Sequence, residues 1–304
     1  MKASGLKALV AGFLTIDTIL LPIRTITSIG GPPSYAGLIC SRFGLDVFPL
    51  TRIGLDFPDD QLVWLARNGI NLRAIDKCSK KTTRFRIEAN GAGRNLYLLS
   101  RCDDLSIDQL PEARFDASLI SPIAHEVSPE LLKAIASRSD FTFLDPQGFV
   151  RNFDNNGQVS IAKLKETGII ASVDALKMDR EEAHAITGKT DAKEALSKLS
   201  SSGVRKALIT QGGDTCFILE GKKIYGVQVP KVKIVDSTGA GDILGGTLVA
   251  SYLRSRDFLW SACFGIAASS LSLNLIALTK VDLPQSVDEQ AKRLYSLAAP
   301  VASA

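Results

Sequence analysis

The chain has 304 residues, of which 45% are hydrophobic and 22% charged; this composition excludes a disordered, collagen-like or coiled-coil protein and leaves one or two domains open. The net charge of +4 is spread along the chain without a long run of like charges, so no nucleic-acid-binding face is expected. The five cysteines include no CxxC pair, which indicates free thiols in a reducing, cytoplasmic compartment instead of a disulfide framework or a zinc site.

Short apolar runs alternate with longer amphipathic segments, which is typical of βαβ units on a parallel sheet. The expected strands are residues 8–13, 47–51, 118–121, 141–145, 169–173 and 207–210. The expected helices are residues 34–43, 60–68, 129–137, 180–187, 192–201, 240–253 and 258–277. The alternation predicts an α/β fold, in which ligands bind at the carboxyl edge of the sheet.

The segment 82–100 departs from this pattern, because apolar and polar residues alternate on both sides of the sequence NGAG at 90–93. Such a segment predicts a β-hairpin with a glycine turn. An isolated hairpin is marginally stable, so we expect it to pair with a further strand in residues 18–27 and to form a small flap over one end of the sheet. The alternative is a surface hairpin without a role.

Two apolar stretches raise the question of a membrane segment. The first, residues 6–21, contains Asp17 and has no small-residue cleavage site after it, so a signal peptide is not expected. The second, residues 258–279, is uncharged and long enough to span a bilayer. Its serines, Asn274 and Gly265 lower its hydrophobicity, and no second segment would join it in the membrane. We therefore expect a buried helix and no membrane partner.

The strongest local signal is a glycine-rich segment between a β-branched run and an apolar helix, from Asp236 to Asp242. Its small residues Gly239, Ala240 and Gly241 leave N–H groups uncovered at a helix N-terminus, which favours an anion such as phosphate. Asp242 is placed to cap the helix or to act as a general base beside that phosphate, as phosphoryl transfer to a hydroxyl needs. Capping alone explains an aspartate here, but not the two glycines together with Asp236.

Two other phosphate-binding motifs fit the chain less well. No GxxxxGK[ST] segment is present, which excludes a Walker-type P-loop. Residues 239–245 fit a GxGxxxG spacing, but they lie in the last third of the chain, and the acidic residue expected about 20 positions further on is found only as Asp257. A dinucleotide-binding fold is therefore disfavoured.

The segment 236–242 resembles the D-T-x-G-A-G-D signature of the ribokinase-like, or PfkB, family of carbohydrate kinases. Five further segments are similar to motifs of this family in order and spacing, over nearly the whole chain. They are Gly12 with Asp17, the diglycine Gly30-Gly31, residues 52–57, residues 179–182 with Thr187-Gly188, and residues 210–214. The chain is thus identified as a member of this family.

The resemblance implies a three-layer α/β/α fold in one domain, residues 1–304, with a mostly parallel central sheet. A β lid from about 17–29 and 82–100 would cover the acceptor. The implied reaction is transfer of the γ-phosphate of ATP to a hydroxyl of a sugar, polyol or nucleoside. Asp242 would be the base, and the amides of Gly239, Ala240 and Gly241 would form the anion hole.

The resemblance also implies a metal site and a nucleotide site. Glu182, with Asp179 in place of the family's asparagine, would hold Mg²⁺, an ion that prefers water and phosphate with one or two carboxylates nearby. A monovalent cation is an open addition, and the oligomeric state is open between a monomer and a homodimer through the lid. The residues implied on the nucleotide side are Asp179, Glu182, Thr210, Gly212, Gly213 and Thr238.

One departure from the family pattern concerns the acceptor. The asparagine expected four positions after Gly31 is Tyr35 here, so a sugar pocket built as in ribokinase is not expected. The G-G-x-x-S-aromatic arrangement of 30–35 and the D-x-Q-G segment of 145–151 resemble the inositol-kinase branch and favour myo-inositol. The acceptor-side candidates are Asp17, Gly30, Gly31, Ser34, Gln147 and Arg151. For Gln147 and Arg151, the alternative is a capped loop after a strand.

Other acceptors and another class of function stay open. Ribose or fructose, a keto-deoxy sugar acid and a nucleoside are the other acceptors. A sugar acid would need a cation in the pocket, which Arg84, Arg86 or Arg151 could supply. A nucleoside would need an aromatic side chain for its base to stack on, such as Tyr35, Phe85 or Tyr97. A non-catalytic sugar-binding or regulatory module of the same fold is the alternative to a kinase, although such a module would not need Asp242.

Overall fold

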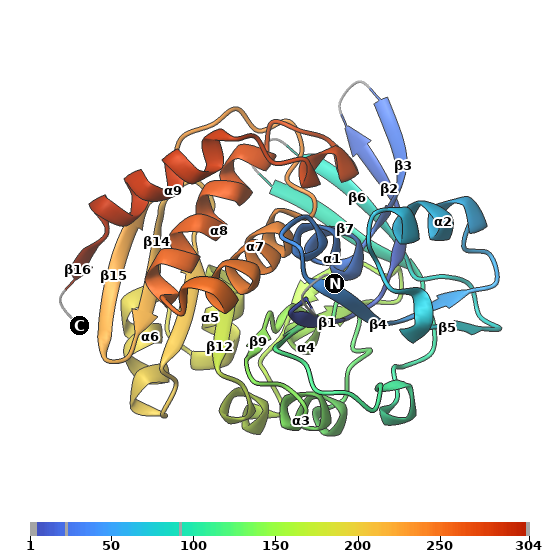
Figure 1. The fold of residues 1–304 in the computed structure, drawn as a ribbon, viewed down its shortest axis with the longest axis horizontal. Coiled ribbons are helices and arrows are strands. Elements are labelled where there is room, and N and C mark those ends of the chain that lie inside the picture. Colours follow the sequence, from blue (N-terminus) through green and yellow to red (C-terminus); the bar gives the residue numbers. More distant parts are fainter. Residues whose placement is uncertain (1–4, 22–23, 91–92, 302–304) are drawn as a thin grey trace.

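The computed structural model describes residues 5–21, 24–90 and 93–301. Within them, ten strands form a central sheet with the order β16-β15-β14-β13-β12-β9-β8-β1-β4-β5 (Figure 1). The strands from β13 to β5 run parallel, and β14 to β16 are antiparallel, so the expected mostly parallel sheet is confirmed. The strands are β1 (Lys7–Ala11), β4 (Asp46–Gly54), β5 (Ile75–Cys78), β8 (Ala117–Ile120), β9 (Thr142–Leu144), β12 (Ala175–Asp179), β13 (Lys206–Thr210), β14 (Thr215–Glu220), β15 (Lys223–Gln228) and β16 (Ala299–Val301).

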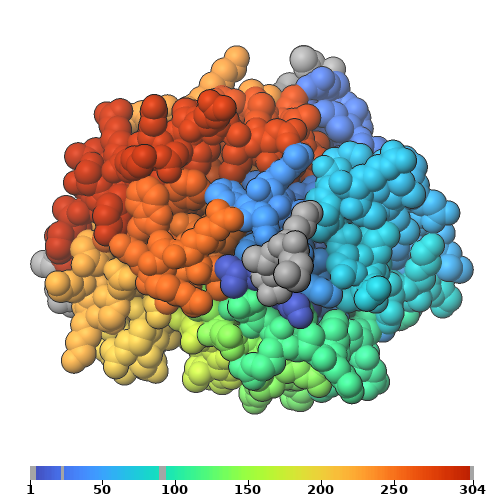
Figure 2. Space-filling model, in the orientation of Figure 1, coloured from blue at the N-terminus to red at the C-terminus, as the bar shows by residue number. Residues whose placement is uncertain are grey.

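Helices cover both faces of this sheet and give the expected three layers. In β1, Ala8 and Val10 belong to one apolar core and Leu9 and Ala11 to the other, since successive side chains point to opposite faces. The first face is covered by α1 (Pro32–Arg42), α2 (Asp59–Arg67), α7 (Ala240–Ser255), α8 (Phe258–Ser272) and α9 (Ser286–Leu297), and the second by α3 (Pro129–Ser137), α5 (Arg180–Thr187) and α6 (Ala192–Ser201). Figure 2 shows the C-terminal helices, in orange and red, beside the N-terminal third of the chain, in blue and cyan.

The lid is a separate four-stranded sheet with the order β3-β2-β6-β7. The hairpin expected in 82–100 is confirmed as β6 (Arg84–Asn90) and β7 (Gly93–Ser100); residues 91–92 of its turn lie outside the described residues. The single partner strand expected in 18–27 is wrong. The chain there forms two strands, β2 (Thr15–Leu21) and β3 (Arg24–Gly30), because β2 satisfies its backbone groups on both edges by pairing with β3 and β6.

Two other expectations differ from the structure. Residues 169–173 fall mainly in the 3₁₀ helix η3 (Thr167–Ser172), whose buried isoleucines pack on the second core, and the strand itself is β12. The helix expected to reach 277 ends at Ser272, because the Leu273 carbonyl accepts hydrogen bonds from the N–H groups of Val235 and Asp236. Among the described helices, none has both the length and the apolar character needed to cross a membrane.

The remaining elements are short. A two-stranded sheet of β10 (Arg151–Phe153) and β11 (Val159–Ile161) follows the four-residue helix α4 (Gln147–Val150). The other 3₁₀ helices are η1 (Leu72–Ala74), η2 (Ile107–Gln109) and η4 (Ala277–Val281).

Candidate active site

The glycine-rich loop leads into α7 through a left-handed turn. Gly239, the residue before the helix, has a φ of 74°, and a Cβ there would lie 2.7 Å from the Tyr35 ring, so only glycine fits without strain. Asp236 anchors the loop, because its carboxylate accepts a hydrogen bond from the Thr238 N–H at 2.8 Å and pairs with the buried Lys280 at 3.2 Å. The loop is therefore held in one conformation before the helix begins.

The N–H groups of this loop are the candidate anion hole. Within the described residues, those of Gly239 and Gly241 have no protein acceptor, whereas that of Ala240 donates to the Ser237 carbonyl at 3.3 Å. Free donors at the N-terminus of a sixteen-residue helix favour an anion. Among the described residues, two of the three amides named from the sequence are thus available to an anion, and their role with a transferred phosphate stays a prediction.

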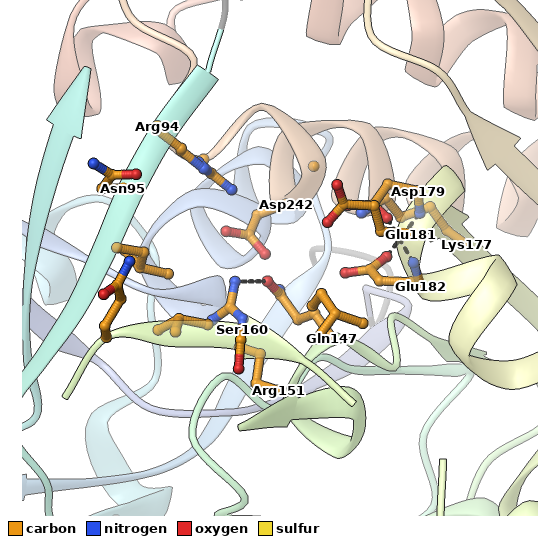
Figure 3. A pocket seen from close by; sticks show the side chains of 16 residues that line it. Arg94, Asn95, Gln147, Arg151, Ser160, Lys177, Asp179, Glu181, Glu182 and Asp242 are labelled. Atoms are coloured by element: carbon orange, nitrogen blue, oxygen red, sulfur yellow. Dashed lines mark hydrogen bonds between the residues drawn. The ribbon is translucent and has the colours of Figure 1, made fainter. Parts of the chain in front are cut away.

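Asp242 lies in the first turn of α7 and lines a central cavity of about 390 Å³ (Figure 3). Burial raises the pKa of its carboxyl to about 7, and the charge of Asp145 adds to this rise, whereas the cations Lys177, Arg151 and Arg94 oppose it. A carboxyl with a pKa near the working pH is suited to accept a proton from a hydroxyl.

A large cavity of about 630 Å³ adjoins the central one, and Lys177, Asp179 and Gly241 line both. The expected nucleotide-side residues Thr210, Gly212 and Gly213 line it. Much of the remaining lining is apolar: Val229, Pro230, Val232, Ile234, Leu244, Ile266 and Leu273. Such a surface suits a flat, largely apolar group such as a nucleobase.

A small cavity of about 70 Å³ lies between the lid and the α7 loop, and Asp17, Gly31, Gln147 and Arg151 line it as expected. The lid contributes Phe85, Ile87, Arg94 and Leu96 to its wall. The loop before α7 separates this cavity from the large one. Thr238, expected on the nucleotide side, lines the small cavity together with Gly239, whereas Ser237, Ala240 and Gly241 face the large cavity.

Polar side chains around the small cavity are fixed by hydrogen bonds. Arg151 donates to Gln147 Oε1 at 2.6 Å and to the Ile123 carbonyl at 3.0 Å, and Gln147 donates to Ser121 Oγ at 3.1 Å. Asp17 is buried and accepts a hydrogen bond from a lid N–H at 3.3 Å, and burial raises the pKa of its carboxyl to about 7. These groups form an ordered polar wall beside Asp242.

Two expected acceptor residues do not line this cavity. Ser34 is fully buried, and its hydroxyl donates to the Gly31 carbonyl at 2.8 Å at the start of α1. The Asp17 carboxylate lies directly over Gly30, since a Cβ built on Gly30 would come within 2.1 Å of Asp17 Oδ2. Both residues shape the site from outside it.

Asp179 and Glu182 meet at the start of α5. The Asp179 carboxylate accepts the Glu182 N–H at 2.8 Å, and the Glu182 carboxylate accepts the Asp179 N–H at 2.7 Å. Burial raises the pKa of Glu182 to about 8, and the positive charge of Lys177 opposes this rise, as a bound cation would. The described residues hold no cluster of three or more metal-ligating side chains. Two carboxylates on the central cavity suit Mg²⁺, which takes its other ligands from water and phosphate.

Two residues of the site, Lys177 and Arg94, escaped the motif analysis, whereas Asp145 opens the D-x-Q-G segment. Lys177 and Asp145 form an ion pair of 2.7 Å, with side chains that are 9% and 3% exposed. A lysine between the apolar residues Leu176 and Met178 of β12 was a signal in the sequence for Lys177. Arg94, on the lid strand β7, lines all three cavities; it directly follows the NGAG turn, but no family motif includes it.

Comparison with curated proteins finds kinases. The chain is 26% identical to a cytidine kinase from Thermococcus kodakarensis, over 83% of this chain and 90% of the relative. It is also 26% identical to an inositol 3-kinase from Arabidopsis thaliana, over 88% of this chain and 74% of the relative. The two relatives act on different classes of acceptor.

Solved structures share the fold. A pyrophosphate-dependent kinase of the ribokinase family, in complex with a pyrophosphate analogue and myo-inositol, superposes with a TM-score of 0.79 at 19% identity, over 90% of this chain and 98% of that chain. Ribokinase from Thermotoga maritima superposes with a TM-score of 0.76 at 20% identity, over 94% and 99% of the two chains. The model of the pfkB family of carbohydrate kinases matches residues 24–280. The chain belongs to this family of phosphotransferases and has its ribokinase-like fold.

Proposed function

We propose that the protein transfers the γ-phosphate of ATP to a hydroxyl of a small polyhydroxy acceptor, with myo-inositol as the favoured acceptor. One observation carries the proposal. The N-terminus of α7, with its free amides and Asp242, lines the central cavity, which adjoins the large cavity through Gly241 and the small cavity through Gly239 and Asp242. A donor in the first and an acceptor in the second would bring their reacting atoms together beside a base.

In the proposed reaction, the acceptor hydroxyl gives its proton to the Asp242 carboxylate as its oxygen bonds to the γ-phosphorus, and ADP leaves as the bond from this phosphorus to the bridging oxygen breaks. The raised pKa makes this carboxylate a better proton acceptor than an exposed one. The free N–H groups of Gly239 and Gly241 bind the oxygens of the transferring group, whose charge is also stabilised by the dipole of α7.

Glu182 and Asp179 are the residues that would hold Mg²⁺ at the donor phosphates. When bound, the ion supplies positive charge that neutralises these phosphates. The chain's own contribution is a pair of carboxylates fixed by the start of α5, on the wall of the cavity that also contains Asp242. This geometry orients the carboxylates without help from the ligand.

The shape of the large cavity supports a nucleotide as donor. Solved neighbours include pyrophosphate-dependent kinases, so the donor is a question that the fold leaves open. A bare pyrophosphate would leave the apolar lining of the large cavity exposed to water, whereas a nucleobase covers it. ATP is therefore the proposed donor, and a requirement for a monovalent cation stays a prediction.

The small cavity supports a compact acceptor. Asp17, Gln147 and Arg151 offer acceptors and donors to several hydroxyls, and the lid closes the space with Ile87 and Leu96, which are directly opposed on β6 and β7. The inositol kinases among the relatives agree with a cyclic polyol. A nucleoside is the second candidate, favoured by the cytidine kinase relative and by the aromatic wall of Tyr35 and Phe85.

The test is ADP release from Mg·ATP by the purified protein with myo-inositol, ribose, fructose, a keto-deoxy sugar acid and nucleosides, and a parallel series with pyrophosphate as donor. We expect myo-inositol to stimulate ADP release most strongly. Asp242→Asn should lower this stimulated rate by at least about 100-fold, since it removes the general base. Asp60→Asn, at an exposed position on α2, is the matched control and should leave the rate unchanged.

Two results would contradict the proposal. If ATP binds but no acceptor stimulates ADP release, a regulatory module of the same fold becomes the better explanation. If a nucleoside is the preferred acceptor, the kinase assignment stands and the polyol assignment does not. NMR of the product would identify the phosphorylated hydroxyl, and size-exclusion chromatography would decide between a monomer and a dimer through the lid.

A further inference from the structure

We propose that Lys177 is a catalytic residue whose ammonium contacts the phosphoryl group during its transfer. The proposal rests on the kinase function proposed above. Lys177 belongs to β12 and lines both the central cavity, which contains Asp242, and the large cavity. Its side chain is thus next to the route from the donor to the base, beside Glu182 in Figure 3.

The Lys177 ammonium lies against the backbone of the α7 loop. A Cβ built on Gly241 would be only 2.9 Å from Lys177 Nζ. Gly241 lines the same two cavities, and its N–H has no acceptor among the described protein groups. A fixed cation and a free amide are therefore neighbours at the place where negative charge moves during the reaction. This is where preorganised positive charge accelerates phosphoryl transfer most.

The Lys177 ammonium has hydrogen-bond donors that the described protein groups do not use. An ammonium carries three N–H donors. In the part of the chain that the structure describes, Lys177 uses one of them, for Asp145 Oδ2 at 2.7 Å. Its side chain is nine-tenths buried, so the two unused donors are available chiefly to a ligand in the adjoining cavities.

The other buried lysine shows what a structural role looks like in the same protein. Lys280 donates to the carbonyls of Asp236 and Thr238 and pairs with the Asp236 carboxylate, which accounts for all three donors. Its contacts hold the α7 loop in place. Lys177 differs because protein groups of the described residues use only one of its donors, and because it lines two cavities.

Asp145 holds Lys177 in position. Asp145 follows β9, and β9 and β12 are neighbouring parallel strands, so the two side chains meet at the same edge of the sheet. The carboxylate fixes the ammonium without occupying all of its donors. A lysine oriented in this way needs little rearrangement when a phosphate arrives.

The chemical step balances without a further reactant. The bond between the γ-phosphorus and the bridging oxygen of the donor breaks, the bond between this phosphorus and the acceptor oxygen forms, and the acceptor proton passes to Asp242. Lys177 donates hydrogen bonds to a non-bridging oxygen of the moving group and exchanges no atom. Because the contact strengthens as the group moves, its loss should lower kcat more than it changes the KM of the acceptor.

The test compares Lys177→Met, Lys177→Arg and Lys177→Ala with the parent protein. We expect Lys177→Met to lower kcat by about 100- to 1000-fold, with an acceptor KM within about threefold of the parent. Lys177→Arg should keep part of the rate, and methylamine should restore Lys177→Ala in a saturable manner. Lys133→Met, at an exposed position on α3, is the matched control and should behave as the parent.

A structural role predicts a different pattern. Removing one partner of a buried ion pair leaves an uncompensated charge, which can unfold the site. The double variant Lys177→Met with Asp145→Leu removes both charges, and we expect it to be folded and still inactive. The proposal is overturned if this double variant turns over at the parent rate, if Lys177→Met does so, or if amines restore nothing to a folded Lys177→Ala.

Calorimetric binding separates this proposal from the function on which it rests. The ratio of the affinities for ATP and ADP should be about tenfold smaller in Lys177→Met than in the parent, since the γ-phosphate loses a charged partner. An unchanged preference overturns the role of Lys177 even if no acceptor has been found. A parent protein that binds no ATP overturns the proposed ATP-dependent function together with it.

Discussion

Replacing Asp242 by asparagine should stabilise the protein at alkaline pH while it removes activity. Burial raises the pKa of this carboxyl to about 7 in the folded protein, against an ordinary value of 3.8. The folded state therefore holds the proton more tightly than the unfolded chain. The resulting stability is fully present below about pH 4 and is lost as the pH rises to about 7, because the folded protein must then contain a buried charge.

The size of the effect follows from the shift. Each pKa unit corresponds to about 1.4 kcal/mol, so between pH 5 and pH 8 the parent loses about 3 kcal/mol that the asparagine variant does not lose. For a chain of this length, 3 kcal/mol corresponds to about 5 °C in melting temperature. The difference in melting temperature between variant and parent should therefore grow by about 5 °C, in favour of the variant, from pH 5 to pH 8.

Differential scanning calorimetry without nucleotide or metal measures this difference. Asp56→Asn is the control: although burial raises the pKa of Asp56, hydrogen bonds from Arg84 and Thr82 lower it to about 2. Its titration lies below the measured range, so the cost of this substitution should be the same at pH 5 and pH 8. A gap between Asp242→Asn and the parent that stays constant or shrinks with pH would refute the reasoning.

Three further outcomes are expected. Gly239→Ala should lower both the melting temperature and the turnover, because a Cβ at this left-handed position costs about 1–2 kcal/mol and displaces the Tyr35 ring; parent-like values in both assays would contradict this. Lys280→Met should cost about 3–5 kcal/mol in urea unfolding, since it leaves a buried carboxylate without its partner, and a cost below about 1 kcal/mol would argue against that. Diamide should link Cys78 to Cys102, whose sulfur atoms are 3.0 Å apart at the base of the lid, and mass spectrometry of unreduced peptides that finds both thiols free would disprove it.

Local patterns were sufficient for most of the fold. Alternating apolar runs predicted the strands of the parallel sheet and the helices between them, because burial on both faces requires continuous apolar residues in each strand. The same reasoning failed at 169–173. Ile169 and Ile170 are buried against the second core, but they belong to a 3₁₀ helix and not to a strand of the sheet. Burial was inferred correctly there, but the backbone conformation was not.

The lid shows that sequence patterns alone do not predict which strands pair. The NGAG turn indicated the hairpin of β6 and β7, since a glycine-rich turn between alternating strands is a local signal. The partner segment carries no comparable turn signal, and its division into β2 and β3 became visible only in the register that joins Thr18 with Thr27 and with Arg86. Strand pairing across such distances depends on the whole sheet.

For the site, the local sequence pointed to the α7 loop and Asp242, and the family resemblance to the two carboxylates at the start of α5, because each belongs to a short segment that starts a helix. Only the tertiary structure decided that Thr238 lines the small cavity and that Lys177 meets Asp145. The reason is physical. A helix start is built from neighbours in sequence, whereas a pair 32 residues apart forms only because β9 and β12 lie side by side in the sheet.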